Sequence, residues 1–166
     1  MNNLQFDFLA NKDNNTLTIR REFNAERQLV WDCYTKQELL DKWFAPKPFT
    51  TKTKSMDFKD GGNWHYAMID QDGNHYWNIM DYTKINPIDF YEALDGFCDE
   101  NATLNPALPR AKWEVTFSDK GENAIVETIV FYNSLTDLET IINMGMQEGM
   151  MSTLEKLDEL LLTFKK

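Results

Sequence analysis

The side chains best suited to binding a metal ion are the chain's two histidines, His65 and His75. They lie on either side of a predicted hairpin turn that carries Asp70 and Asp72. Two imidazoles and a carboxylate are ligand types that zinc accepts. However, the chain has no HExxH or CxxC motif, and two surface histidines on a polar strand face explain the same pattern. The sequence therefore predicts no metal site.

Asp81 is the first residue to test for a catalytic role. In the alternating run HYWNIMDYTKI it shares strand parity with Trp77 and Ile79. On a cavity-lining face its carboxyl group would lie among apolar side chains, which raises the pKa and suits general acid–base catalysis. If this face of the strand points to solvent instead, Asp81 is a solvated surface residue. We favour the surface position because buried unpaired carboxylates are rare, and we assign no catalytic residue.

The signatures of nucleophilic and nucleotide chemistry are missing from the sequence. There is no GxSxG turn for a nucleophilic serine, and no Walker or dinucleotide-binding fingerprint. Gly61 and Gly62 follow Asp60, a pattern typical of a hairpin turn rather than a phosphate loop. The sequence therefore predicts no cofactor, and it favours a non-enzymatic role without deciding the question.

Large apolar side chains are a prominent feature of the composition, with five tryptophans and eight methionines. Such residues either fill a core or line a pocket with aromatic and adaptable thioether groups. On the second interpretation, the candidate ligand-binding residues are Trp43, Trp64, Tyr66, Met68, Trp77, Trp113, Phe117, Met146 and Met150.

A C-terminal helix is predicted to position the last two of these candidates. Apolar residues recur every three or four positions from Leu135 to Phe164, which is the helical period. We therefore predict one long amphipathic helix over 135–164. Gly145 and Gly149 share one ridge of this helix, which indicates either close backbone approach or open space beneath it.

The rest of the chain is predicted to supply the surface on which this helix packs. Strand-like alternation dominates, and only residues 25–45 have the spacing of short helices, ended by Pro46. Strands followed by a helix favour an α+β fold with a curved antiparallel sheet of six to seven strands. Within one domain, 1–166, we predict a lead-in segment over 1–15, a strand over 16–23, two short helices over 25–45, strands over 49–94, an acidic loop over 95–109, strands over 111–132 and the long helix over 135–164. The loop is a pocket lid, a partner contact or an ordinary solvated loop.

Charge and cysteine usage restrict the partners and the compartment. The formal charge of −10 argues against nucleic acid and anionic membranes, which would repel the protein. No apolar run approaches the roughly 20 residues that span a bilayer. Cys33 and Cys98 form no CxxC pair, and the N-terminus lacks a secretory-signal pattern. We therefore expect a cytoplasmic protein with reduced cysteines.

The order and spacing of several motifs resemble a known family. The pattern RxFxAxxxxVWxxxTxxxxLxxW runs from Arg21 to Trp43, followed by Asp60-Gly61-Gly62, Tyr82-x-x-Ile85-x-Pro87 and Gly149-Met150. Together these resemble the START-like (SRPBCC) superfamily, in the branch of the C-terminal domain of the activator of Hsp90 ATPase. One departure is methionine at position 150, where relatives often have tryptophan.

The resemblance implies a helix-grip fold, in which the curved sheet surrounds the long C-terminal helix. It also implies three functions. The first is binding of a hydrophobic small molecule in a cavity of several hundred Å³ between sheet and helix, a size typical of ligand sites. The second is interaction with a chaperone, and the third is a cyclase- or aromatase-like enzyme. A homodimer through a sheet edge or the helix is a further expectation, and fold alone does not choose among these functions.

Overall fold

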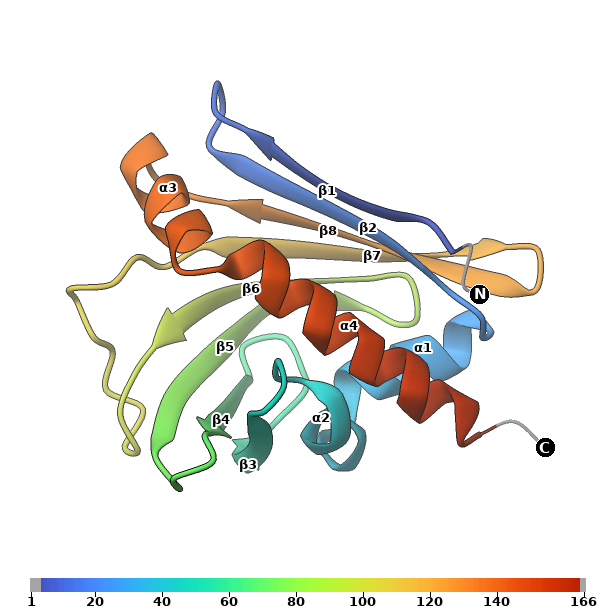
Figure 1. Ribbon diagram of the computed structural model, residues 1–166, viewed down its shortest axis with the longest axis horizontal. Helices are drawn as coiled ribbons and strands as arrows, with labels where there is room; N and C mark the ends of the chain where they lie inside the picture. Colours follow the sequence, from blue (N-terminus) through green and yellow to red (C-terminus); the bar gives the residue numbers. More distant parts are fainter. Residues whose placement is uncertain (1–3, 165–166) are drawn as a thin grey trace.

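The computed structural model describes residues 4–164, and the strands among them form one curved, eight-stranded antiparallel sheet (Figure 1). The strands are β1 (Phe6–Asn11), β2 (Thr16–Phe23), β3 (Thr50–Met56), β4 (Asn63–Ile69), β5 (His75–Asn86), β6 (Phe90–Phe97), β7 (Lys112–Lys120) and β8 (Asn123–Phe131). Their order in the sheet is β1-β2-β8-β7-β6-β5-β4-β3. The fold is α+β, as the sequence predicts.

The helices cover the concave face of this sheet. They are α1 (Arg27–Thr35), α2 (Gln37–Trp43), α3 (Leu135–Asn143) and α4 (Met146–Leu162) within the described part of the chain. Figure 1 shows α4 crossing the sheet, with α1 and α2 beside its C-terminal half. The C-terminal helix gripped by a curved sheet is the arrangement that the family resemblance implies.

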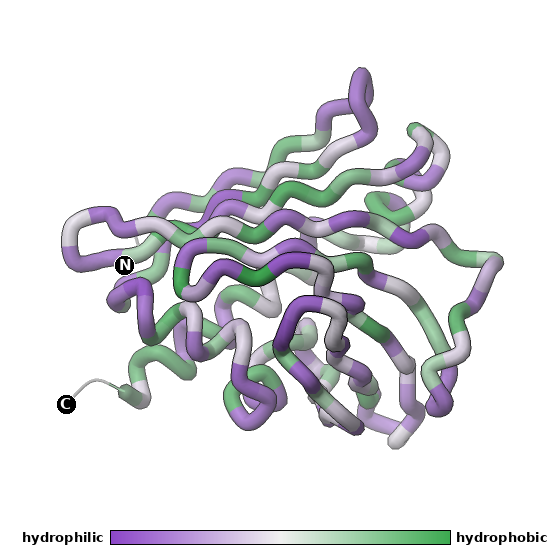
Figure 2. The backbone as a smooth tube through the Cα atoms, turned by 180° about the vertical axis from the view of Figure 1, so that it is seen from behind, coloured by the Kyte–Doolittle hydropathy of each residue, from purple (hydrophilic) through white to green (hydrophobic). Residues whose placement is uncertain are grey.

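Strand periodicity explains why one face is buried. Along β8 the side chains of Ala124, Val126, Thr128 and Val130 are buried, and the residues between them are partly exposed. Successive strand residues point to opposite faces, so a period of two separates core from surface. Seen from the side opposite Figure 1, the strands show this alternation of hydrophobic and hydrophilic residues (Figure 2).

The eighth strand, β1, lies in the segment predicted as a lead-in. It pairs antiparallel with β2, from Phe6 opposite Arg21 to Asn11 opposite Thr16. Phe6 and Phe8, on the inner face of β1, pack against the core. β1 is an edge strand with one partner and only half-buried side chains, so its sequence carries a weak strand signal. The predicted number of six to seven strands was therefore too low.

The prediction of one uninterrupted helix over 135–164 is also wrong. The helix breaks between α3 and α4 at Gly145, whose φ of 91° is in the left-handed region. Glycine adopts this conformation without the steric penalty that a Cβ brings. Leu138 of α3 packs in a separate small cluster with Leu17, Val130 and Tyr132. α3 therefore covers this smaller cluster, together with Met146 at the start of α4.

Polar contacts tie α4 to the rest of the protein. Arg21 on β2 forms an ion pair with Asp158 beneath the helix. Lys156 Nζ donates to the carbonyl oxygens of Ala45 at 2.8 Å and Phe49 at 3.1 Å. Burial lowers the pKa of Lys156, while these carbonyls satisfy its ammonium group. These contacts fix the C-terminal half of α4 over the sheet.

The acidic loop after β6 lies on the convex face of the sheet. His65 on β4 is buried beneath it, and its Nε2 lies 3.0 Å from the carbonyl oxygen of Asp99. Gly96 allows this approach, because a Cβ there would lie 2.6 Å from Leu104 Cδ2. No residue of the segment 98–109 lines the cavity described below. The loop is therefore not a lid over that cavity.

Among residues 4–164, no helix is long and apolar enough to cross a membrane.

Candidate functional site

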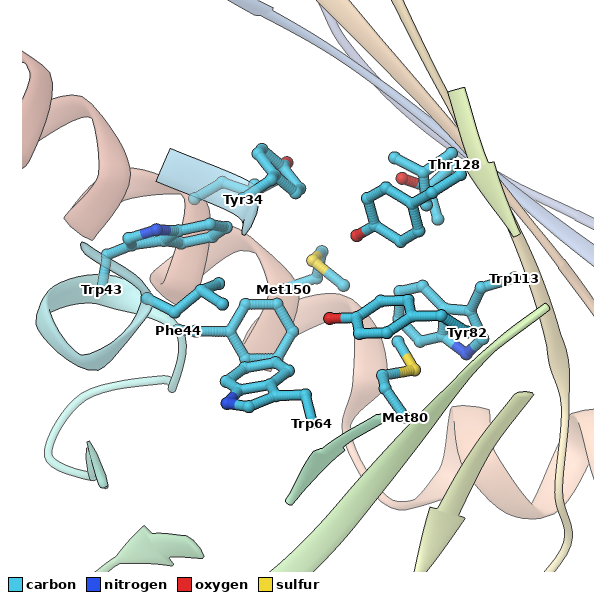
Figure 3. Close-up of a pocket in the computed structure, with 13 residues that line it drawn as sticks. Tyr34, Trp43, Phe44, Trp64, Met80, Tyr82, Trp113, Thr128 and Met150 are labelled. Atoms are coloured by element: carbon cyan, nitrogen blue, oxygen red, sulfur yellow. The ribbon is translucent and has the colours of Figure 1, made fainter. Parts of the chain in front are cut away.

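The candidate site is a small apolar cavity between the concave face of the sheet and α4 (Figure 3). The space open to the centre of a water molecule is about 20 Å³. One water needs roughly 10–15 Å³ by this measure, so the cavity holds about one. The expected several hundred Å³ is wrong for this conformation, because large side chains fill the space. The lining residues are Tyr34, Leu40, Trp43, Phe44, Trp64, Met80, Tyr82, Tyr91, Trp113, Val115, Thr128, Met150 and Leu154.

One wall is an aromatic group supplied by α2 and β4. Trp43 at the end of α2 is held in place because its Nε1 donates to the carbonyl oxygen of Cys33 at 2.9 Å. Phe44 lies between Trp43 and Trp64, with ring centroids 5.2 Å and 5.1 Å away in edge-to-face geometry. Trp64 in turn stacks on Tyr66 at 3.7 Å. Edge-to-face contacts of this kind stabilise the wall beyond the area they bury.

Unpartnered hydroxyl groups are the main polar feature of the cavity. Tyr34, Tyr82, Tyr91 and Thr128 are 8%, 3%, 6% and 7% exposed, and each lines the cavity. Within residues 4–164, no hydrogen bond joins any of these hydroxyls to another protein group, and none of them is among the fully enclosed polar atoms that lack a partner, so each borders open space. In Figure 3 the hydroxyl of Tyr82 points toward the middle of the group. Buried polar groups are normally hydrogen-bonded, so this cluster indicates partners from outside the chain.

Burial also fixes the protonation of these phenols. It raises the pKa of Tyr34, Tyr82 and Tyr91 far above the ordinary value for tyrosine, because desolvation penalises the phenolate. All three stay protonated at neutral pH and can each donate one hydrogen bond and accept others. The cavity thus offers hydrogen-bonding groups without any charged side chain among its lining residues.

A carboxylate lies just outside this lining. Asp95 on β6 is directly opposite Met80 in the sheet, so both project from the concave face. Its oxygens accept from the backbone N–H of Ala111 and from Trp113 Nε1, each at 2.7 Å. Burial raises the pKa of Asp95, although these two hydrogen bonds oppose the shift. The sequence placed Asp95 in an acidic loop, whereas β6 continues to Phe97.

The structure brings four of the predicted ligand-binding residues together. Trp43, Trp64, Trp113 and Met150 all line the cavity. Tyr66 and Phe117 are buried in the surrounding core, behind the lining, and Met68 and Met146 pack against it from partly exposed positions. Whether any of these residues contacts a ligand stays a prediction.

Trp77 and Asp81 lie on the other face of the sheet. The inward residues of β5 are Met80 and Tyr82. The residues that alternate with them, including Trp77 and Asp81, therefore point to the convex side. There Trp77 lies between the rings of His65 and His75, at centroid distances of 5.0 Å and 5.7 Å. The placement predicted for Trp77 was therefore wrong.

Asp81 has the surface position that the sequence favours. Its carboxylate accepts a hydrogen bond from Arg110 Nη2 on the convex face. It is thus outside the cavity and paired with a cation, and it has no access to a molecule bound under α4. No group of three histidine, cysteine or acidic residues with metal-site geometry occurs in the described part of the chain.

Sequence reasoning missed most of the polar lining. Met80 and Tyr82 lie on one face of β5, but Trp77 and Ile79 make the other face equally apolar, so the pattern did not show which face lines the cavity. The usable signal was Thr128, a hydroxyl residue in the inward row of Ala124, Val126 and Val130. A polar residue in an otherwise apolar strand face indicates a site where hydrogen bonding matters.

The sequence profile of the family described as activator of Hsp90 ATPase homolog 1-like protein matches residues 24–162. The chain belongs to this family. No curated protein matches the chain significantly. The matched range begins just after β2, so the activator-homolog profile includes both short helices, the cavity and α4. The family assignment agrees with the START-like resemblance of the sequence.

Solved structures of similar proteins have the same fold. Protein Ms6760 from Mycobacterium smegmatis is 28% identical with a TM-score of 0.87, and the alignment covers 95% of this chain and 96% of that one. A protein from Staphylococcus epidermidis is 25% identical with a TM-score of 0.83 and 95% coverage of both chains. A protein from Arthrobacter aurescens has a TM-score of 0.89 at 24% identity, covering 95% and 91%. At that identity the likeness concerns the fold alone.

Proposed function

We propose that this activator-homolog protein binds a small hydrophobic molecule between the sheet and α4. The observation that carries the proposal is the cluster of buried hydroxyls on Tyr34, Tyr82, Tyr91 and Thr128, which lack partners in the described chain and border one cavity. The favoured ligand has an apolar, flat body that fits between aromatic rings. It also carries a hydrogen-bonding atom, such as a phenolic or carbonyl oxygen, that the hydroxyls contact.

The ligand enters by displacing flexible side chains. The present space of about 20 Å³ is too small for an aromatic ring, but Met80 and Met150 form part of its wall. Methionine has an unbranched side chain with three rotatable bonds, so it changes shape at little energetic cost. Met150 is also partly exposed, which gives it room to move away from the sheet. The cavity is therefore expected to enlarge on binding.

Fragment titration tests the proposal. We would titrate the protein with para-propylphenol and follow backbone and methionine methyl NMR signals. Binding at the site moves the signals of Met80 and Met150 saturably, and native mass spectrometry of gently purified protein detects any molecule already bound. The proposal fails if the signals do not move, or if they move only on the convex face.

A matched pair of variants makes the test specific. Met150→Trp places a larger ring into the space and is expected to weaken binding more than about tenfold, because overfilled sites leave no room for the ring. Met151→Trp is the control, since Met151 is 41% exposed on the adjacent surface of the same helix. Equal binding by both variants would contradict the proposed position of the ligand.

A second candidate function is stimulation of an Hsp90-type chaperone. The family assignment and the nearly filled cavity both favour it, because a packed domain performs its function through its outer surface. The test is the ATPase rate of a purified Hsp90-type chaperone with and without this protein. Stimulation that persists in Met150→Trp would separate this function from ligand binding. An unchanged ATPase rate at low salt counts against it.

A further inference from the structure

We infer that the ligand carries a positively charged nitrogen, which the Asp95 carboxylate binds at the α3 end of the cavity. This inference rests on the proposed function and specifies the chemical class of the molecule. The ligand would be an amphipathic amine, with its apolar ring among the buried phenols and its ammonium group at Asp95. The argument depends on the position of Asp95, on the neutral donors that its carboxylate accepts from and on its neighbours.

Asp95 is adjacent to the cavity on the concave face. Its indole partner, Trp113, lines the cavity, and so does Met80, which lies directly opposite Asp95 on β5. In Figure 3 the indole nitrogen of Trp113 points away from the middle of the cavity, and it is this nitrogen that donates to Asp95. One aromatic side chain thus separates the phenol cluster from the carboxylate. A molecule with a ring and a short chain would have to extend past the Trp113 indole to reach the carboxylate.

Within residues 4–164, no cationic side chain donates a hydrogen bond to this carboxylate. Both of its hydrogen-bond donors, the Ala111 N–H and the Trp113 indole, are neutral. Arg110 is close enough to influence it, but Arg110 Nε donates to the Asp95 carbonyl oxygen at 2.6 Å, and Nη2 binds Asp81 on the convex face. Burial raises the pKa of Asp95 even though the charge of Arg110 opposes the shift, so its carboxylate is incompletely compensated, and a bound ammonium group would stabilise it.

Other cations on the concave side are already engaged. Arg21 is paired with Asp158, and Lys156 donates to two backbone carbonyls beneath α4. Asp95 also lies near aromatic residues, since its charge influences the hydroxyls of Tyr66 and Tyr132. Aromatic faces attract an ammonium group through cation–π interaction, whereas a ligand carboxylate would be repelled by Asp95. The net charge of −10 further raises the local concentration of cationic molecules.

The alternative role for Asp95 is purely structural. It holds the Ala111 N–H and the Trp113 indole, and a buried indole N–H needs an acceptor. Asp95→Asn separates the two roles, because asparagine keeps the size and one carbonyl oxygen but removes the charge. If the role of Asp95 is structural, this substitution weakens the binding of all ligands equally. If its charge binds the ligand, the substitution weakens the binding of cationic ligands only.

Three phenols that differ in the end of their side chain provide the test. They are tyramine with an ammonium group, para-propylphenol with a methyl group of similar size, and para-hydroxyphenylpropionate with a carboxylate. Dissociation constants are measured by NMR titration at pH 7 and low salt. In the unaltered protein we expect tyramine to bind at least about tenfold tighter than para-propylphenol, and the carboxylate to bind most weakly.

Charge removal at two positions completes the experiment. Asp95→Asn is expected to weaken tyramine binding about tenfold and to leave para-propylphenol within about twofold. Glu122→Gln in the exposed β7–β8 turn makes the same change in net charge away from the site, and should leave the preference for tyramine intact.

The outcomes separate the inference from the function on which it rests. If para-propylphenol binds but tyramine has no advantage, or if Asp95→Asn weakens both equally, the amine inference is overturned and ligand binding stands. If none of the three phenols binds, the proposed function and the inference fail together. Equal binding of the carboxylate and the amine also overturns the inference.

Discussion

At the scale of single residues, the cavity differs from an ordinary core in how its polar atoms are satisfied. Most buried polar side chains of this protein have protein partners: Thr51 donates to the carbonyl of Phe44, and Trp64 Nε1 donates to Thr53 Oγ1. The hydroxyls around the cavity do not follow this rule in the described chain. A hydroxyl without a protein partner in a buried position adds little to stability, so these hydroxyls are available to a bound molecule.

Replacing two buried threonines by valine tests this difference. Thr128→Val removes a hydroxyl without a protein partner, so we expect the free energy of unfolding to stay the same or to rise by up to about 1 kcal/mol. Thr51→Val removes a hydroxyl that donates to Phe44 at 2.5 Å, in a strand and equally buried. It should lower the free energy of unfolding by about 1 kcal/mol. Urea unfolding measures both, and equal losses would contradict the interpretation of Thr128.

A second residue-scale prediction concerns acid stability. Glu22 accepts hydrogen bonds from Asn123 Nδ2 at 2.7 Å, from the Gln5 N–H at 3.2 Å and from Lys120 Nζ at 3.1 Å. These contacts, led by Asn123, lower the pKa of Glu22 from 4.5 to about 2. The folded-state pKa is below the unfolded one, so the stabilisation is fully present above about pH 4.5 and disappears as the pH falls toward 2.

Glu22→Gln should therefore lower the free energy of unfolding at pH 7 and flatten its decline between pH 4.5 and pH 2. Urea unfolding at a series of pH values measures this slope. Glu122→Gln, at an exposed turn position, is the matched control and should leave the slope as it is. An unchanged slope in Glu22→Gln would show that Glu22 is not responsible for it.

At the scale of elements, the junction of α3 and α4 decides what covers the sheet. Gly145 ends one helix and begins the next, its N–H donating to the Ile142 carbonyl at 3.0 Å. Gly149 lies inside α4, and a Cβ there would make ordinary contact with Pro46 Cγ at 3.8 Å. The two glycines share a ridge in the sequence pattern, yet only Gly145 has a conformation that requires glycine.

Alanine at each position should act in opposite directions. Gly145→Ala is expected to lower the free energy of unfolding by about 1–2 kcal/mol, because an L-residue is strained in the left-handed region. Gly149→Ala is expected to raise it by up to about 1 kcal/mol, because alanine is the better helix former. Thermal or urea unfolding gives both values. A stabilising Gly145→Ala would mean that the helix runs on without a break.

The sequence predicts some of these elements for clear physical reasons. Alternating strands and hairpin turns such as Asp72-Gly73 have local signals, so the sheet follows from the pattern. The helix break has a single local signal, Gly145 itself, which is outweighed because Ile142, Met146 and Met150 continue the helical period across it. The inward face of β5 is ambiguous since both faces are apolar. The volume of the cavity depends on the rotamers of the large side chains, which no sequence pattern specifies.

At the scale of the whole molecule, the sheet is open, and its two edge strands differ in charge and in the contacts that support them. β3 carries Lys52 and Lys54, and α2 supports it, as Asp41 accepts from the N–H and hydroxyl of Thr53. β1 at the other edge pairs only with β2 and exposes Leu9. Exposed edge strands with few charges favour pairing with other chains, and β1 carries only one charged residue, Asp7. β1 also lies outside the range that the family profile matches.

Hydrogen exchange should reveal this asymmetry. β7 and β8 each have strand partners on both sides, whereas β1 has one. We expect amides of β1 to exchange at least about tenfold faster than those of β8, because edge strands open with less free energy than central ones. Exchange followed by mass spectrometry of peptic peptides measures both. Equal protection would indicate that β1 is covered, for example by a second copy of the chain.

The break at Gly145 also has a consequence for length. A straight helix from Leu135 to Leu162 would extend about 42 Å at 1.5 Å per residue. A globular chain of 166 residues has a radius of gyration of only about 15 Å and thus a diameter of roughly 40 Å. A rod of that length would span the entire protein. Divided in two, the same stretch of chain changes direction at Gly145, and both pieces pack on an apolar surface, α3 through Leu138 and α4 through Leu154 and Leu157.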